Sequence, residues 1–139
     1  MDKMDEAKRE LIQMWLIKAQ HDLASARKLA ADPDPILDTA IYHCQQAGEK
    51  AVKAFLAFHD HPLEKTHNVR TLVTLAESYD VRFASWREAG EQLTPYATAF
   101  RYPAGAPEPD EETFAAAEQA AAALLAFACS LLPKEARPD

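Results

Sequence analysis

Apolar residues recur at steps of three and four positions along the first part of the chain. That spacing places them on one stripe of a helix and predicts a long amphipathic helix over residues 5–31. The stripe consists of Ile12, Leu16, Ala19, Leu23, Ala26 and Ala30. Residues 32–35 contain two prolines and end this helix, because proline cannot continue a helical hydrogen-bond ladder. A second helix is predicted over residues 36–59, with an apolar side made by Ile41, Cys44, Ala51, Phe55 and Phe58.

Three further helical segments are predicted downstream. A third helix is capped by Thr66 or Asn68 and carries its apolar positions at Val69, Leu72, Leu75 and Ala76. A fourth runs over residues 82–94 with Phe83, Trp86 and Leu93 as anchors, and Pro95 either kinks it or begins a short turn that extends to Phe100. Residues 101–110 hold three prolines and one glycine and predict a loop. A last helix begins over residues 110–113, where acidic side chains suit the positive end of a helix dipole, and ends near Leu132.

No segment shows the alternation of a strand, so the pattern predicts an all-α fold. Short connections between long helices favour antiparallel neighbours and therefore an up-and-down bundle of four to five helices. The chain of 139 residues fits one domain, with a core over about residues 8–132 and a mobile tail at 133–139.

Composition and charge narrow the class of protein. Apolar residues make up 48% and charged residues 27% of the chain, which is typical of a water-soluble domain. A net charge of -7 disfavours non-specific binding of duplex DNA, because the protein repels a polyanion at long range. The charged N-terminal region predicts no signal peptide, and Glu118 and Gln119 interrupt the longest apolar run, which predicts no membrane span. We therefore expect a cytoplasmic protein, in which Cys44 and Cys129 are small buried hydrophobic residues rather than a disulfide.

One polar face of the second predicted helix holds the candidate chemistry. His43, Gln46, Lys50 and Lys53 are separated by three, four and three positions and therefore share a face. One interpretation is a solvated face with an ion pair between Glu49 and Lys53, four residues apart. The other is a cationic groove that binds a phosphate group, because ammonium, amide and imidazole groups can all donate hydrogen bonds to that anion.

Two spacings resemble metal sites. Glu64 and His67 have the Glu-x-x-His spacing of di-iron bundles, but the chain has one such pair, and it straddles a loop. His59 and His61 flank a helix end, where solvated loop residues are the simpler interpretation. We therefore expect neither a metal site nor another cofactor.

The second helix also carries a resemblance to a known family. Its residues 42–56, Tyr-His-Cys-Gln-Gln-Ala-Gly-Glu-Lys-Ala-Val-Lys-Ala-Phe-Leu, resemble the most distinctive stretch of HEPN domains (higher eukaryote and prokaryote nucleotide-binding domains). Three other pieces are similar to the family pattern in the same order: Trp15, Ala19, Asp22, Leu23 and Ala26 in the first helix, Thr66-His67-Asn68 before Leu72, and Arg101-Tyr102-Pro103 before the last helix. The resemblance spans about residues 15–132.

The resemblance implies a helical bundle that commonly forms a dimer, has a cleft for a nucleotide or RNA, and frequently pairs with a small nucleotidyltransferase. Many family members are metal-independent RNases that use an arginine, a short spacer and a histidine near the last helix. Arg101 fits this pattern, but Ala106, Pro107 and Glu108 stand where the histidine is expected, and no histidine follows His67. The nuclease activity is therefore not transferred to this chain.

We therefore expect a homodimeric module that binds the phosphate of a nucleotide or of an RNA end. The expected ligand-binding residues are Gln46, Lys50, Lys53, His67, Arg101 and Tyr102. Lysine and arginine would neutralise charge, His67 and Gln46 would donate hydrogen bonds, and Tyr102 would stack or shape the pocket. Arg101 and His67 are the candidates for any catalysis. Two alternatives stay open: a divergent metal-independent RNase or toxin of a toxin–antitoxin pair, and an antitoxin-like scaffold that binds another protein.

Overall fold

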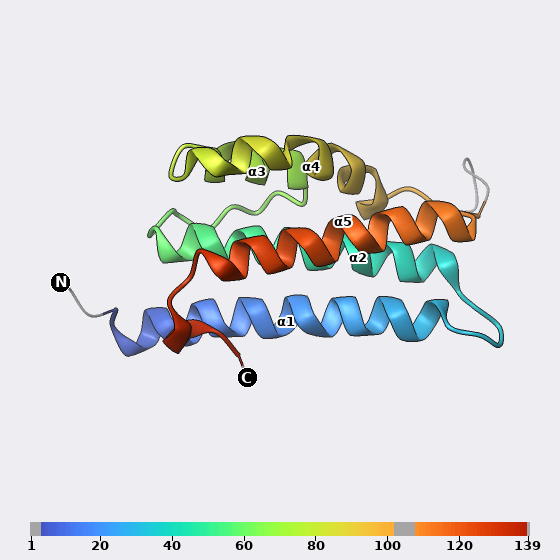
Figure 1. The fold of residues 1–139 in the computed structure, drawn as a ribbon, viewed down its shortest axis with the longest axis horizontal. Coiled ribbons are helices and arrows are strands. Elements are labelled where there is room, and N and C mark those ends of the chain that lie inside the picture. Colours follow the sequence, from blue (N-terminus) through green and yellow to red (C-terminus); the bar gives the residue numbers. More distant parts are fainter. Residues whose placement is uncertain (1–3, 102–107, 139) are drawn as a thin grey trace.

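The fold is a bundle of helices, shown in Figure 1 as a computed structural model that describes residues 4–101 and 108–138. Five α-helices and three short 3-10 helices follow one another along the chain: α1 (Glu6–Ala30), α2 (Leu37–Phe58), α3 (Val69–Glu77), η1 (Val81–Trp86), α4 (Arg87–Leu93), η2 (Thr94–Ala97), α5 (Glu111–Ser130) and η3 (Lys134–Ala136). The described residues contain no strand. The prediction of an all-α bundle is confirmed.

Helices α1, α3 and α5 begin where the sequence supplies a capping side chain. Asn68 accepts a hydrogen bond from the backbone N–H of Thr71 at 2.9 Å, so of the two predicted caps of α3 it is Asn68 that performs this role. Thr66 instead accepts a hydrogen bond from the backbone N–H of Asn68. Asp5 and Asp110 cap α1 and α5 in the same way. Each cap provides an acceptor for an N–H group that has no partner inside its helix.

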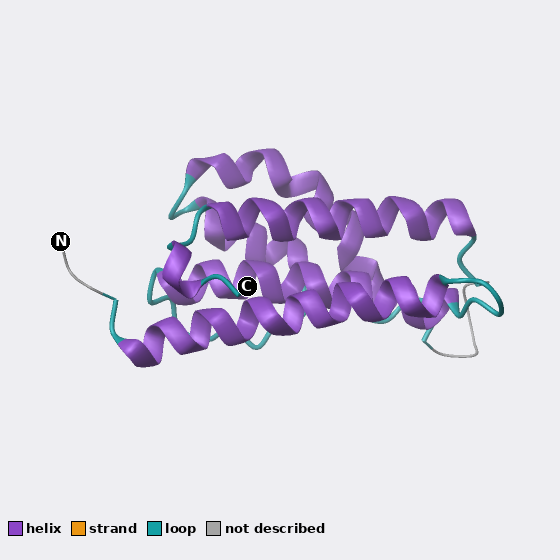
Figure 2. Cartoon of the chain, turned by 60° about the horizontal axis from the view of Figure 1, so that its bottom comes forward, coloured by secondary structure: helices purple, strands orange, loops and turns teal. Residues whose placement is uncertain are grey.

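Helix α2 is the centre of the bundle, because it packs against α1, α3, α4, η2 and α5. Figures 1 and 2 show α1, α2 and α5 running along the long axis of the molecule, while the shorter α3 and α4 lie together on one side. The core between these helices is fully apolar over a long stretch and is formed by Ile12, Leu16, Ile41, Val52, Phe55, Leu72, Phe83, Leu93 and Leu124. Three polar residues of α2 also lie in the interior, since Gln45, Glu49 and Lys53 are buried.

The segment predicted as a fourth helix over residues 82–94 is divided into η1 and α4. Asp80 caps η1, whose 3-10 geometry places residues three positions apart on the same side. Phe83 and Trp86 are three apart, and both point to aromatic partners: Phe83 lies 4.6 Å from Phe55 and Trp86 lies 4.9 Å from Phe127, measured between ring centroids. Aromatic packing, which the sequence pattern does not reveal, thus accounts for the change of helix type.

The end of the chain contacts α5. Residues 133–138 belong to the segment predicted as a mobile tail, and they contain η3, whose Ala136 is fully buried. The guanidinium of Arg137 donates hydrogen bonds to the carbonyl oxygen of Leu132 at 2.7 and 2.9 Å. It also donates to the carbonyl of Ser130 at 3.3 Å, so it satisfies acceptors at the end of α5.

By length and composition, α5 is the one described helix apolar enough to cross a membrane. In the bundle, however, Phe114, Ala121 and Leu124 pack into the core. Glu118 accepts a hydrogen bond from Arg27 of α1. These contacts hold one side of α5 against the bundle, while 28% of its apolar stretch is buried, and the expectation that the protein has no membrane span stays a prediction.

Candidate functional site

Asp22 of α1 contacts two residues of the predicted polar face of α2. Its side chain is buried, with Oδ1 2.8 Å from Nδ1 of His43 and Oδ2 2.6 Å from Nζ of Lys50. An ionised carboxylate only accepts hydrogen bonds, so Nδ1 of His43 carries a proton and Nε2 is the nitrogen that remains for a ligand. The charge of Lys50 is compensated within the protein.

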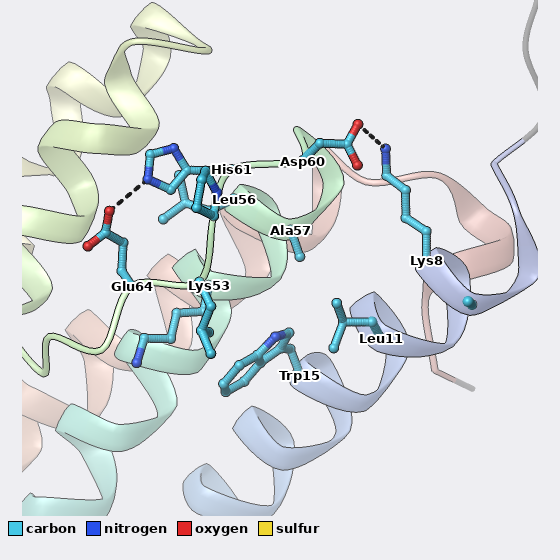
Figure 3. A pocket seen from close by; sticks show the side chains of 12 residues that line it. Lys8, Leu11, Trp15, Lys53, Leu56, Ala57, Asp60, His61 and Glu64 are labelled. Carbon is cyan, nitrogen blue, oxygen red and sulfur yellow. Dashed lines mark hydrogen bonds and ion pairs between the residues drawn. The ribbon is translucent and has the colours of Figure 1, made fainter.

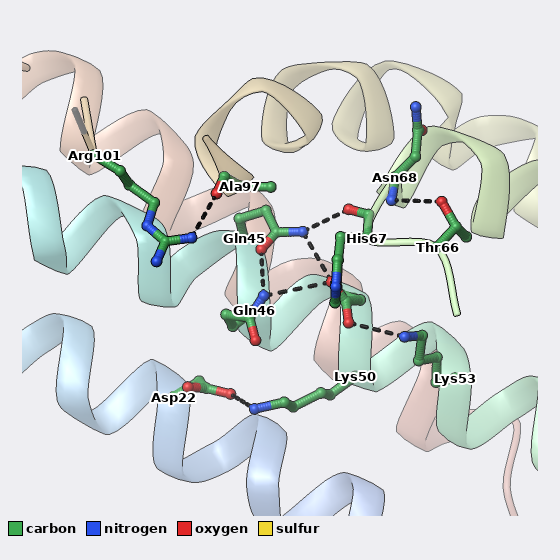
Figure 4. Close-up of polar contacts among 11 residues, drawn as sticks. Asp22, Gln45, Gln46, Lys50, Lys53, Thr66, His67, Asn68, Ala97 and Arg101 are labelled. Carbon is green, nitrogen blue, oxygen red and sulfur yellow. Dashed lines mark hydrogen bonds and ion pairs between the residues drawn. The ribbon is translucent and has the colours of Figure 1, made fainter. Parts of the chain in front are cut away.

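Glu49 contacts a second group of polar residues, of which Figure 4 labels Gln45, Gln46, Lys53 and His67. It is 3% exposed, and its Oε2 accepts a hydrogen bond from Nζ of Lys53 at 2.9 Å. Its Oε1 lies 3.1 Å from Nε2 of Gln45, 3.4 Å from Nε2 of Gln46 and 3.0 Å from Nδ1 of His67. The expected pair between Glu49 and Lys53 exists, but the pair is buried rather than solvated. The charge of Lys53 is therefore compensated as well.

Arg101 lies apart from both groups (Figure 4). Its guanidinium carbon is 4.3 Å from the centroid of the Tyr42 ring, and Nη1 donates a hydrogen bond to the carbonyl of Ala97 at 3.1 Å. A pocket of about 280 Å³ adjoins it and is lined by Asp38, Thr39, Tyr42, His43, Phe100 and Arg101. Arg101 thus shares a pocket with His43 and not with the lysines.

The predicted site residues are found in three places. Gln46, Lys53 and His67 contact Glu49, Lys50 contacts Asp22, and Arg101 lines the pocket beside Tyr42. Tyr102 lies outside the described residues. Two of the three places are connected, because His43 lines the Arg101 pocket and shares the carboxylate of Asp22 with Lys50. The ligand-binding role of the six predicted residues stays a prediction.

Sequence reasoning missed Asp22, Glu49 and Tyr42 as parts of this site. For Asp22 the sequence did hold a signal, since it lies next to Leu23 beside the apolar stripe of the first helix, where a buried carboxylate requires a partner. Glu49 was expected to pair with Lys53 alone. For Tyr42 there was no such signal, because its contact with Arg101 joins residues 59 positions apart in the chain.

Comparison with known proteins agrees with this arrangement of helices. The HEPN domain family model matches residues 12–132. The crystal structure of TT1696 from Thermus thermophilus is similar to this chain with a TM-score of 0.73 and 26% sequence identity, covering 88% of this chain and 99% of that chain. No curated protein matches the chain significantly. Since the family match runs from the core residue Ile12 to the core residue Leu132, and so covers well over half of the chain, the protein belongs to the HEPN domain family.

Proposed function

We propose that this HEPN-family chain binds the phosphate group of a nucleotide or of an RNA end in the pocket that Arg101 shares with His43 and Tyr42. The observation that carries the proposal is the fixed guanidinium. The Tyr42 ring lies 4.3 Å from it, and the Ala97 carbonyl accepts one of its hydrogen bonds. A guanidinium held in this way has N–H groups left for a phosphate and loses little side-chain freedom when it binds one.

Other groups that line the pocket define its preference. Thr39 offers a hydroxyl to the ligand, and Asp38 contributes a carboxylate. Oδ1 of Asp38 already accepts hydrogen bonds from Thr39, from the backbone N–H at 2.7 Å and from the hydroxyl at 3.3 Å. Arg101 is therefore opposed by one negative charge in the same pocket. Because like charges repel, we expect a single phosphate to bind better than a triphosphate. Lys50 and Gln46 act in this proposal through their contacts to Asp22 and Glu49.

The test is titration calorimetry with AMP, ATP and short RNAs that carry or lack a terminal phosphate. Arg101→Ala should weaken binding at least tenfold, because hydrogen bonds to a charged group contribute about 1.5–3 kcal/mol and tenfold is about 1.4 kcal/mol. Arg82→Ala is the matched control, since Arg82 is also an exposed arginine but pairs with Asp80 outside the pocket. Wild-type protein that binds none of these ligands, or Arg101→Ala protein that binds as well as wild type, would refute the proposal.

The contact of His43 with Asp22 favours a second candidate function, metal-independent RNA cleavage. Asp22 holds the proton on Nδ1, which leaves Nε2 of His43 as a general base for the 2′-hydroxyl. The 2′-oxygen would attack phosphorus to form a cyclic phosphate, and the 5′-oxygen would leave with a proton returned by the imidazolium or by water. Arg101 lines the same pocket and would stabilise the negative charge that develops on the phosphoryl oxygens. A histidine from α2 would thus replace the one that is missing after Arg101.

Cleavage of short RNAs separates the two candidate histidines. His43→Ala should abolish cleavage under this proposal, whereas His67→Ala should leave it unchanged, because His67 contacts Glu49 and does not line the pocket. RNA that stays intact with wild-type protein would leave phosphate binding as the function. Equal cleavage by wild type and His43→Ala would exclude the catalytic role of His43.

We also propose that the chain is a homodimer and pairs with a small nucleotidyltransferase. Support for a dimer comes from α5, where Ala116, Ala123 and Ala126 are exposed and permit close approach of another helix. Light scattering should give twice the 15.4 kDa of one chain. Ala123→Glu should shift the measured mass toward that of a single chain. Co-purification of the chain with a small nucleotidyltransferase tests the proposed pairing with that enzyme.

A further inference from the structure

A second pocket, of about 450 Å³, lies between the first half of α1 and the end of α2, where the chain continues toward α3 (Figure 3). Its apolar lining consists of Ala7, Leu11, Trp15, Leu56, Ala57, Pro62 and Leu63. It shares no lining residue with the Arg101 pocket. We propose that it binds an uncharged small molecule with a flat apolar ring and one hydrogen-bond acceptor.

The apolar surface of the pocket calls for an apolar ligand. Leu11 is 48% exposed and Leu63 is 69% exposed. Burial of large apolar side chains away from water is favourable, so a ligand that covers these leucines would be stabilised. The volume falls within the range of sites that enclose small ligands, about 300–1,000 Å³. A ring-sized apolar molecule that fills the pocket would cover both leucines.

The charges around the pocket call for an uncharged ligand, because each is already paired inside the protein. Lys8 pairs with Asp60 at 3.1 Å and Lys53 with Glu49 at 2.9 Å, while the carboxylate of Glu64 lies within hydrogen-bond distance of Nε2 of His61, at 2.9 Å. A charged ligand would have to break one of these pairs or enter the pocket without a partner of its own. Either costs free energy, whereas a neutral ligand leaves all three pairs in place.

Trp15 supplies both a flat wall and a hydrogen-bond donor. Nζ of Lys53 lies 5.7 Å from the centroid of its ring, a cation–π contact that fixes the indole. Within residues 4–101 and 108–138, its Nε1–H has no acceptor. The nitrogen is not buried, so a ligand can reach it. This donor is why the proposed ligand carries an acceptor.

The wall opposite α1 is held in place by hydrogen bonds within the protein. The backbone N–H of His61 donates to the carbonyl of Leu56 at 3.0 Å. The ring of His61 is held from both sides, with Nδ1 2.7 Å from the hydroxyl oxygen of Tyr79 and Nε2 2.9 Å from Glu64. The pocket therefore needs no folding step to accept its ligand, which favours small-molecule binding.

The experiment uses two fluorescent probes with related naphthalene rings: Prodan, which is uncharged and has a carbonyl acceptor, and 8-anilino-1-naphthalenesulfonate, which is anionic. Prodan should bind saturably, with one probe per chain, and at least fivefold more tightly than the sulfonate. Leu63→Asp should weaken Prodan binding at least fivefold. Trp15→Phe, which keeps a ring but removes the donor, should also weaken it.

The matched control is Val81→Asp, because Val81 is 75% exposed, apolar and outside the pocket. It should bind Prodan within twofold of wild type, as should Arg101→Ala, which separates this pocket from the phosphate site. Unchanged far-UV circular dichroism and melting temperature of Leu63→Asp show that its fold is intact. The proposal is overturned if Prodan does not saturate, if Leu63→Asp and Val81→Asp bind alike, or if the sulfonate binds as tightly as Prodan.

Discussion

The buried Glu49 offers the sharpest test of the polar network. We predict that Glu49→Gln lowers the free energy of unfolding by about 3–5 kcal/mol, the range for a buried ion pair that loses one partner. The substitution keeps the shape of the side chain but removes its negative charge. The group that faces Lys53 is then either an amide N–H donor or an uncharged carbonyl oxygen. Lys53 is 7% exposed, so water cannot replace the lost carboxylate. Because small domains have a stability of about 5–15 kcal/mol, the loss is a large part of the total.

The partner substitution gives an asymmetric result. Lys53→Met leaves Glu49 with hydrogen bonds from Gln45, Gln46 and His67, so the expected loss is only about 1–3 kcal/mol. In the double variant Glu49→Gln with Lys53→Met no ammonium is left buried without a carboxylate. We therefore expect the double variant to lie within about 1 kcal/mol of Lys53→Met alone, and the two changes to be non-additive.

Urea unfolding followed by circular dichroism measures these differences. Glu6→Gln is the control, because Glu6 forms an exposed pair with Arg9 at 3.3 Å and such pairs contribute about 0–1 kcal/mol. The reasoning fails if Glu49→Gln is no more harmful than Glu6→Gln. It also fails if the double variant loses the sum of the two single losses, since Glu49 and Lys53 would then act independently.

Three further predictions concern a thiol, an imidazole and a helix cap. Burial, with a smaller contribution from Glu118, raises the pKa of the Cys44 thiol to about 12. At pH 8 iodoacetamide should therefore modify the half-buried Cys129 first, and Cys44 only after urea unfolds the chain. Mass mapping that finds early modification at Cys44 would contradict this. Burial, and then the charge of Lys8, lower the pKa of His59 below 6.5, so the unfolded chain binds this proton more readily. The contribution of His59 to stability is therefore present above about pH 6.5 and is lost as the pH falls. Between pH 7 and pH 5, the free energy of unfolding measured in urea should depend less on pH for His59→Phe than for wild type. Equal dependence in the two proteins would contradict the lowered pKa of His59. Asp110→Ala should cost about 0.5–2 kcal/mol in the same unfolding assay, because the cap of α5 loses its acceptor for the N–H of Thr113, and Asp110→Asn should restore most of it.

The helices and their ends were predictable from the sequence because they depend on local interactions. Apolar spacing fixed the buried side of α1 and α2, and the caps at Asp5, Asn68 and Asp110 act on N–H groups three residues further along. The predicted bounds 5–31 and 36–59 therefore agree with Glu6–Ala30 and Leu37–Phe58 to within one residue. The division of residues 81–93 into η1 and α4 was not predictable, since it depends on aromatic partners from α2 and α5.

The sequence alone determined that a row of polar and cationic residues lies along one face of α2, because helical periodicity orders side chains that are three or four positions apart. Only the tertiary structure decided how those charges are used. Asp22 reaches His43 and Lys50 from 21 and 28 positions away, and Arg101, which follows η2, stacks on Tyr42 of α2. The free energy of such contacts depends on which helices pack against each other. The same sequence pattern therefore fits a lysine whose charge is compensated within the protein and a lysine that is free to bind phosphate.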